Sequence, residues 1–122
     1  MSQPALIAFA DSAPAAVEDR PAPERAIGTP PRRLTAERYA AEDGAVSIGD
    51  WACEPGAWRI RFHSGRHEFF HVLEGRIRIT DEQGVAREFG PGEACVIPAG
   101  FVGVFEVLEA VKKRYVMIDR PA

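Results

Sequence analysis

Glu68 is the side chain in this sequence that is best suited to proton-transfer chemistry. Two phenylalanines, Phe69 and Phe70, follow it directly. Burial among aromatic rings would remove water from the carboxylate, and a desolvated carboxylate is suited to general acid or base catalysis. The alternative interpretation is a structural ion pair with Arg59 or Arg61. Glu68 is therefore the first candidate for a catalytic residue, and Phe70 is a candidate ligand contact beside it.

A basic face precedes Glu68 in the chain. Arg59, Arg61 and His63 alternate with apolar residues, so a β-strand would place all three on one side. The other side would carry Trp58, Ile60 and Phe62. If the basic side lines an interior cavity, these three residues would bind a carboxylate or ureido-like ligand, the arginines through forked hydrogen bonds. If the apolar side lines the interior, the arginines are solvated, and the sequence leaves both alternatives open.

The chain around these candidates alternates between apolar and polar residues in short runs, which is typical of half-buried strands. Residues 58–62 and 76–80 show this alternation, and residues 81–84 form a hairpin connection. Later strands are expected over residues 94–97, 101–108 and 111–118. Roughly seven or eight short strands, without a convincing amphipathic helix, predict a sandwich or a jelly-roll barrel.

The first 40 residues differ in composition from the rest. They contain six of the ten prolines of the chain, together with many alanines and balanced charges. Such a segment is expected to be an extended arm, because proline disrupts helices and central strands. Within it, residues 5–9 are apolar enough to add to a sheet edge. We therefore predict an N-terminal arm over residues 1–40 and one folded domain over residues 41–122.

Length, charge and cysteine content limit the classes of partner. A chain of 122 residues fits one domain, and its net charge of −3 provides no electrostatic basis for nucleic-acid binding. No window is long and apolar enough to span a membrane, and the first residues lack the features of a secretory signal. Cys53 and Cys95 form no C-x-x-C pair, so free thiols and a cytoplasmic location are expected.

Two segments, residues 68–75 and 92–100, each join a strand to a glycine turn. They resemble the two signature motifs of the cupin superfamily, and in particular those of ureidoglycine aminohydrolase and ethanolamine-utilisation cupin domains. Matching turn residues include residues 49–51, 53–58, 89–92 and 97–101. The resemblance implies an all-β, single-domain cupin jelly-roll, which is a double-stranded β-helix sandwich. It also implies that two copies pair as a homodimer.

Many cupins hold a divalent metal in the barrel, and the resemblance carries only part of that ligand set to this chain. The superfamily positions for two histidines, a glutamate and a later histidine correspond here to Arg61, His63, Glu68 and Gly103. His63 and Glu68 are thus kept as metal ligands, and a loop shorter by one residue would replace His63 with Ser64. The resemblance implies either no metal or a manganese, iron or zinc ion on an incomplete site.

Two further histidines would complete such a site only through an irregular loop. His67 is adjacent to Glu68, and neighbours in a strand point to opposite faces. His71 lies three positions beyond Glu68 and is also out of phase with it. A catalytic metal usually needs three protein ligands, so the local sequence does not assemble a complete set.

Lys113 and Tyr115 are in phase on the last predicted strand. Lys113 matches a lysine typical of the resembling branch, which implies that both residues face the cavity as candidate catalytic residues. Phe105 is a candidate ligand contact or a core residue. The resemblance implies a protein that binds a small carboxylate or nitrogenous metabolite. The alternatives are a metal-dependent aminohydrolase-like enzyme of ureide or amine catabolism, and a metal-free sensor or structural partner without chemistry.

Overall fold

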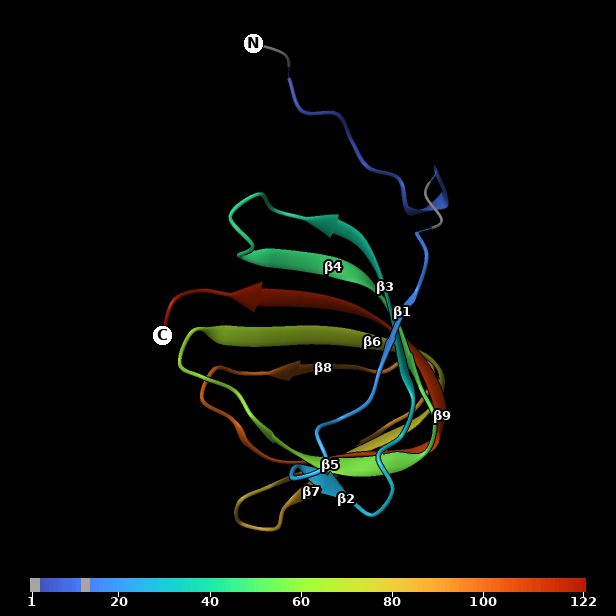
Figure 1. The fold of residues 1–122 in the computed structure, drawn as a ribbon, viewed down its shortest axis with the longest axis vertical. Coiled ribbons are helices and arrows are strands. Elements are labelled where there is room, and N and C mark those ends of the chain that lie inside the picture. Colours follow the sequence, from blue (N-terminus) through green and yellow to red (C-terminus); the bar gives the residue numbers. More distant parts are fainter. Residues whose placement is uncertain (1–2, 12–13) are drawn as a thin grey trace.

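Two long antiparallel strands, β6 (Arg66–Asp81) and β9 (Val102–Asp119), form the centre of the fold (Figure 1). The structure is a computed structural model and describes residues 3–11 and 14–122. β6 and β9 pair along nearly their whole lengths. The remaining strands extend the sheet on both sides of this pair.

The larger part of the sheet is built on the N-terminal half of β6 and the C-terminal half of β9. There β4 (Val46–Cys53) lies beside the C-terminal half of β9, and β3 (Arg33–Ala40) lies beside β4. β1 (Val17–Asp19) forms the edge next to β3. On the opposite side, β8 (Ala94–Ile97) pairs with the N-terminal half of β6.

The smaller part of the sheet is built on the C-terminal half of β6 and the N-terminal half of β9. β5 (Gly56–Arg61) pairs with the N-terminal half of β9, and β2 (Ala26–Ile27) forms the edge next to β5. β7 (Ala86–Phe89) pairs with the C-terminal half of β6. The sheet curls so that its two halves face each other (Figure 1). The predicted all-β, single-domain jelly-roll is confirmed.

Both long strands bend where they pass from one half to the other. Gly75 lies at the bend of β6 with a φ of 85°, and the pairing with β9 shifts register around it. A Cβ atom on Gly75 would lie 2.2 Å from the carbonyl oxygen of Ala110. Glycine is required here by the left-handed backbone and by the close approach of β9. β9 bends at the same place, and the strands predicted over residues 101–108 and 111–118 are its two halves.

The N-terminal 40 residues contribute more to the sheet than their composition predicts. β1, β2 and β3 all come from this segment, and β3 pairs along most of β4. The prolines fall before β1 or between these strands, and β1 and β2 are edge strands, where proline nearby is tolerated. Residues 1–2 and 12–13 of the predicted arm lie outside the described residues.

The apolar run over residues 5–9 does not add to a sheet edge, in contrast to the prediction. Residues 5–8 are extended without a pairing partner, and Phe9–Asp11 form a single turn of 3-10 helix. The guanidinium of Arg38 donates a hydrogen bond to the carbonyl oxygen of Phe9 at 2.6 Å. Residues 3–8, which precede this turn, run away from the barrel (Figure 1).

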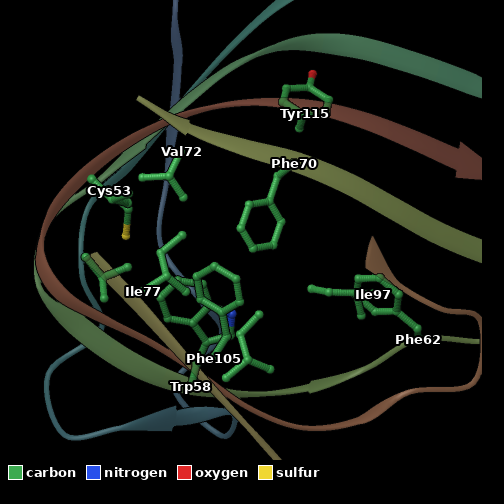
Figure 2. Close-up of a cluster of buried hydrophobic side chains, with 12 residues drawn as sticks. Cys53, Trp58, Phe62, Phe70, Val72, Ile77, Ile97, Phe105 and Tyr115 are labelled. Carbon is green, nitrogen blue, oxygen red and sulfur yellow. The ribbon is translucent and has the colours of Figure 1, made fainter. Parts of the chain in front are cut away.

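Apolar side chains fill the space between the two halves of the sheet (Figure 2). The rings of Trp58 and Phe105 stack with 5.1 Å between their centroids, and Trp51 meets Phe105 edge-on at 5.8 Å. Phe70 and Val72 on β6 are completely buried against this cluster. Removal of these large side chains from water is the main favourable contribution to folding.

Two expectations from composition can be compared directly with the structure. Cys53 and Cys95 are free thiols, as predicted. Burial raises the pKa of the Cys53 thiol to about 12, so this group stays protonated at neutral pH. Within the described part of the chain, no helix is both long enough and apolar enough to cross a membrane.

Candidate functional site

The concave side of the sheet encloses a cavity of about 370 Å³, to which six strands contribute. Its apolar wall is formed by Trp51, Trp58, Ile60, Phe62, Ile97, Phe105 and Met117. Its polar groups come from Arg33, Thr35, Glu37, Ser47, Arg66, Glu68, Lys113 and Tyr115. A mainly hydrophobic wall with a few converging polar groups is typical of small-molecule sites. We call this space the barrel cavity.

Glu68 and Lys113 form an ion pair inside the barrel cavity. The Nζ of Lys113 lies 2.7 Å from Oε2 of Glu68, and the side chains of Lys113 and Glu68 are 4% and 9% exposed, respectively. Trp51, Phe70 and Phe105 surround the ammonium, with ring centroids 4.4, 4.4 and 4.9 Å from Nζ. The carboxylate and the three ring faces together offset the lost hydration of the ammonium. The cavity thus holds a positive and a negative charge side by side in apolar surroundings.

Alternation along β6 and β9 brings these groups to the interior. On β9, Lys113 and Tyr115 are buried while the residues that flank them in the strand are largely exposed. On β6, Glu68 and Phe70 are buried while Phe69 is exposed. The structure therefore places all three predicted catalytic residues at the cavity. Phe70 pairs opposite Tyr115, but it is completely buried in the core and is not among the residues that line the cavity, in contrast to its prediction as a ligand contact.

A chain of hydrogen bonds connects Tyr115 to the protein surface. The hydroxyl of Ser47 donates to Oε2 of Glu37 at 2.6 Å, and the oxygens of Ser47 and Tyr115 lie 3.0 Å apart. Since the single proton of Ser47 goes to Glu37, Tyr115 donates its own proton to Ser47. Burial raises the pKa of the Tyr115 hydroxyl, which keeps it protonated at neutral pH. The Tyr115 oxygen therefore presents its lone pairs as acceptors.

The bent pair β6–β9, the jelly-roll order of the other strands and the glycine turns all match one known class of domain. Residues 40–115 match the family model described as EutQ-like cupin domain. The chain belongs to the EutQ-like cupin family. No curated protein is similar enough to count as a match.

Solved structures of other proteins show the same fold. A protein of unknown function from Pseudomonas syringae superposes with a TM-score of 0.75 at 21% identity, over 84% of this chain and 43% of its own. The putative ethanolamine utilization protein Q of Salmonella typhimurium gives 0.63 at 20%, over 73% and 71%. EutQ of Clostridium difficile gives 0.63 at 19%, over 73% and 69%. This cupin therefore spans less than half of the Pseudomonas protein, and the predicted resemblance is confirmed at the level of the fold.

In this cupin the apolar side of β5 lines the barrel cavity, which decides between the two alternatives that the sequence left open. Trp58 is buried and Ile60 is half-buried, whereas Arg59 and Arg61 are exposed on the outer side. Burial of the tryptophan stabilises the fold, whereas burial of two guanidinium groups without acidic partners would be costly. Arg59 and Arg61 do not meet Glu68, and neither ion pair considered for Glu68 forms.

His63 also lies outside the barrel cavity of this cupin. Its Nε2 lies 2.6 Å from Oδ1 of Asp119, and its Nδ1 accepts a hydrogen bond from the backbone of Gly65 at 3.1 Å. Arg66 donates to the other carboxylate oxygen of Asp119 at 2.8 Å. His63 and Glu68, the two ligands implied by the resemblance, therefore have separate partners and do not converge on a common point.

The side chains around Glu68 do not fit the metal site typical of cupins. Among the residues that the structure describes, no group of three His, Cys, Asp or Glu side chains could hold a metal ion. At the later ligand position, a Cβ atom on Gly103 would lie 2.2 Å from the carbonyl oxygen of Thr80. The space near Gly103 is filled by the neighbouring strand, and the cation next to Glu68 is Lys113. We therefore derive no chemical step through a metal.

Asp119 makes the stability of this cupin dependent on pH at acid values. Hydrogen bonds from Arg66, and to a smaller extent from His63, lower the pKa of Asp119 below its ordinary value near 3.8. A carboxyl with a depressed folded-state pKa contributes stability above the unfolded pKa, and that contribution is lost as pH falls through the lower, folded value.

We expect the free energy of unfolding to fall between about pH 5 and about pH 3 by more in the wild type than in Asp119→Asn. Chemical denaturation at a series of pH values measures the difference. The effect is expected to be modest, because the ion pair is solvent-exposed. Identical pH profiles for the two proteins would contradict it.

Five polar residues of the barrel cavity were not predicted from the sequence: Arg33, Thr35, Glu37, Ser47 and Arg66. Arg33 and Glu37 belong to β3, within the segment interpreted as an arm. Their alternation with less polar residues is also typical of a solvated strand face, so residue type alone does not reveal the cavity. The pairing of β3 with β4 in this cupin is what brings Glu37 to Ser47.

Proposed function

We propose that this EutQ-like cupin binds a small metabolite carrying both a carboxylate and an N–H donor group, such as an amino or ureido acid. The observation that supports this proposal is the buried Glu68–Lys113 pair. Lys113 has three N–H donors and uses one of them on Glu68. Oε1 of Glu68 accepts no hydrogen bond from any described residue, so it is free to accept one from a ligand.

The shape and lining of the barrel cavity support a small, partly apolar ligand. A volume of about 370 Å³ lies at the lower end of the range for small-molecule sites. Trp58 and Phe105 would contact the carbon skeleton of the ligand, and the lone pairs of Tyr115 would accept a further N–H bond. The carboxylate would lie next to Lys113 and the nitrogen next to Glu68.

Hydrolysis of such a ligand, as in an aminohydrolase-like enzyme of ureide or amine catabolism, is the second candidate function. The chain Tyr115–Ser47–Glu37 favours it, because this chain offers a route for protons between the cavity and the exposed Glu37. Glu68 would act as the general base or acid in that case. Release of ammonia during incubation would identify turnover, whereas saturable binding without product would support the binding function.

Calorimetric titration of the full chain tests the binding function. The ligands are small carboxylates, α-amino acids, ureido acids and ethanolamine, the last because a fold neighbour is described as a putative ethanolamine utilization protein. Glu68→Gln removes the buried negative charge and is expected to weaken binding of the N–H-bearing ligand about tenfold.

Glu74→Gln is the matched control, because the side chain of Glu74 is 66% exposed on the same strand. We expect it to bind as the wild type does. Circular dichroism establishes that both variants are folded. Equal loss of affinity in the two variants, or binding of no ligand in the set, would contradict the proposal.

We also propose that two copies of the chain pair through the outer face of the larger sheet half. A row of apolar residues crosses five strands there through direct cross-strand pairs, and consists of Val96, Phe69, Val116, Ile48 and Tyr39. Val96, Phe69 and Tyr39 are 62%, 45% and 39% exposed. A contiguous exposed apolar row favours an interface, and a two-fold axis would place the row of one copy on that of the other.

Val96→Glu is expected to convert this dimer to a monomer, because it places a charge within an apolar contact. Val85→Glu is the control, since Val85 is 59% exposed in the hairpin outside the row. Light scattering at micromolar concentration gives the mass of each protein. A monomeric wild type, or dissociation by both substitutions, would contradict the proposed interface.

We propose that the protein is located in the cytoplasm, where the glutathione pool keeps cysteines reduced. The two free thiols support the assignment.

A further inference from the structure

A second, smaller cleft of about 180 Å³ lies beside β5 and shares part of its lining with the barrel cavity, namely Arg33, Trp58, Ile60, Phe62 and Arg66. It runs between the outer side of β5 and the loop that precedes β2. Its polar lining consists of Arg25, Arg33, Arg59, Arg61 and Arg66. No acidic residue is among the described residues that line it. We call this space the arginine cleft.

Three of these five guanidinium groups have no acidic partner among the described residues. Arg33 pairs with Asp19 at 2.7 Å, and Arg66 pairs with Asp119 at 2.8 Å. Within residues 3–11 and 14–122, Arg25, Arg59 and Arg61 take part in no ion pair or side-chain hydrogen bond. The chain as a whole has a net charge of −3, whereas positive charge is concentrated in this cleft. Repulsion between like charges destabilises such a cluster.

The backbone holds this cluster together. Arg59 and Arg61 alternate along β5 and so project from the same side of the strand. The backbone N–H of Arg59 donates to the carbonyl oxygen of Arg25 at 2.9 Å, which fixes the loop beside β5. The three unpartnered arginines are therefore held near one another by the fold and are not brought together only by side-chain motion.

Arg66 supplies an independent indication of a missing acceptor. Its Nε is buried, and it has no hydrogen-bond partner in the structure. The same residue lines both the arginine cleft and the barrel cavity. A buried N–H without an acceptor is costly, so a ligand oxygen that reached Nε after a rotation of the Arg66 side chain would stabilise this position.

We propose that the arginine cleft binds a small, multiply charged oxyanion. Guanidinium groups bind phosphate and carboxylate oxygens through paired, charge-assisted hydrogen bonds. A cleft of about 180 Å³ has roughly six times the volume of a liquid water molecule, which is sufficient for a phosphate group or a compact polycarboxylate. The anion neutralises the repulsion among the arginines, and a rotation of the Arg66 side chain would let the anion accept the hydrogen bond that Nε lacks. This site is separate from the Glu68–Lys113 pair and does not depend on the ligand of the barrel cavity.

Calorimetric titration of the full chain with inorganic phosphate, pyrophosphate and citrate at low ionic strength tests this site. We expect saturable binding of at least one anion with one site per chain, weakening as salt is added. Tighter binding of pyrophosphate than of citrate assigns the site to phosphate compounds, and the reverse order assigns it to polycarboxylates. The double variant Arg59→Gln/Arg61→Gln is expected to lose about tenfold in affinity for each arginine, or about 100-fold in total.

Arg87→Gln is the matched control, because Arg87 is an exposed arginine on β7 that does not line the cleft. We expect it to bind the anion as the wild type does. A second readout is the NMR signal of the Arg66 Nε–H, which should shift on addition of the anion. Absence of binding by all three anions, or equal weakening by Arg87→Gln and by the double variant, would overturn the proposal.

Discussion

Replacing Lys113 with methionine is expected to lower the free energy of unfolding by about 3–5 kcal/mol, because Glu68 is left without a partner in the interior. Methionine has a similar length and packs well against aromatic rings, so the loss reports mainly on charge. The three rings around Nζ would keep their contact with the side chain. Urea denaturation at neutral pH, followed by circular dichroism, measures the change.

Two further variants make this prediction specific. Lys112→Met changes the neighbouring lysine, whose side chain is 64% exposed and lies 3.8 Å from Glu74, and should change stability by no more than about 0.5 kcal/mol. The double variant Glu68→Met/Lys113→Met removes both charges and should regain most of the loss. If both lysine variants lost the same stability, the buried pair would have no special role.

Replacing Gly75 with alanine is expected to destabilise the fold by about 3 kcal/mol or more. The φ of 85° at Gly75 lies in the left-handed region, which costs a residue with a Cβ atom about 1–3 kcal/mol. The new Cβ would also lie 2.2 Å from the carbonyl oxygen of Ala110, and relief of that overlap requires β6 and β9 to separate at their bend. Urea denaturation of the variant measures the total.

Gly84→Ala separates the two contributions. Gly84 has the same φ of 85°, but a Cβ atom added there would have no heavy atom of another part of the chain within 4 Å. We expect a loss of about 1–2 kcal/mol from the backbone alone. If Gly84→Ala and Gly75→Ala were equally destabilised, the close approach of β9 to β6 would contribute nothing to the requirement for glycine at the bend.

The two sides of β5 differ in electrostatic character, and this difference suggests two kinds of ligand. Inside the barrel, Glu68 and Lys113 neutralise each other, and Lys113 is enclosed by aromatic rings. Outside, Arg59 and Arg61 share a cleft with other arginines and no acidic residue among its described lining. The first arrangement suits a neutral or zwitterionic metabolite, and the second suits an anion. Glu68 and Lys113 do not line the arginine cleft, and Arg59 and Arg61 do not line the barrel cavity. Substitutions at these four residues can therefore test the two sites separately.

The fold could be predicted well because its signals are local. Glycine turns, such as those at Gly92 and Gly100, have a positive φ in the structure, which is the physical reason for glycine there. The alternation along residues 111–118 predicted the inward phase that Lys113 and Tyr115 share. The arm was predicted less well, because proline content does not show whether short edge strands form between the prolines.

The candidate site was only partly predictable. Glu68, Lys113 and Tyr115 are at the cavity, but Arg59, Arg61 and His63 are not. Alternation along a strand shows which residues share a side, but it does not show which side faces the cavity. That choice depends on the balance between burial of Trp58 and burial of the arginines. Hydrophobic burial decides it, and the arginines are left on the outer face.

By itself, the sequence determined the class of fold, the family and the phase of the inward-facing residues on each strand, because each of these depends on neighbours along the chain. Only the tertiary structure decided which side of β5 faces the cavity, that Lys113 neutralises Glu68, and that Glu37 and Ser47 connect Tyr115 to the surface. These contacts join residues from different strands. They form only when the sheet bends at Gly75 and closes around its core, so no local pattern could reveal them.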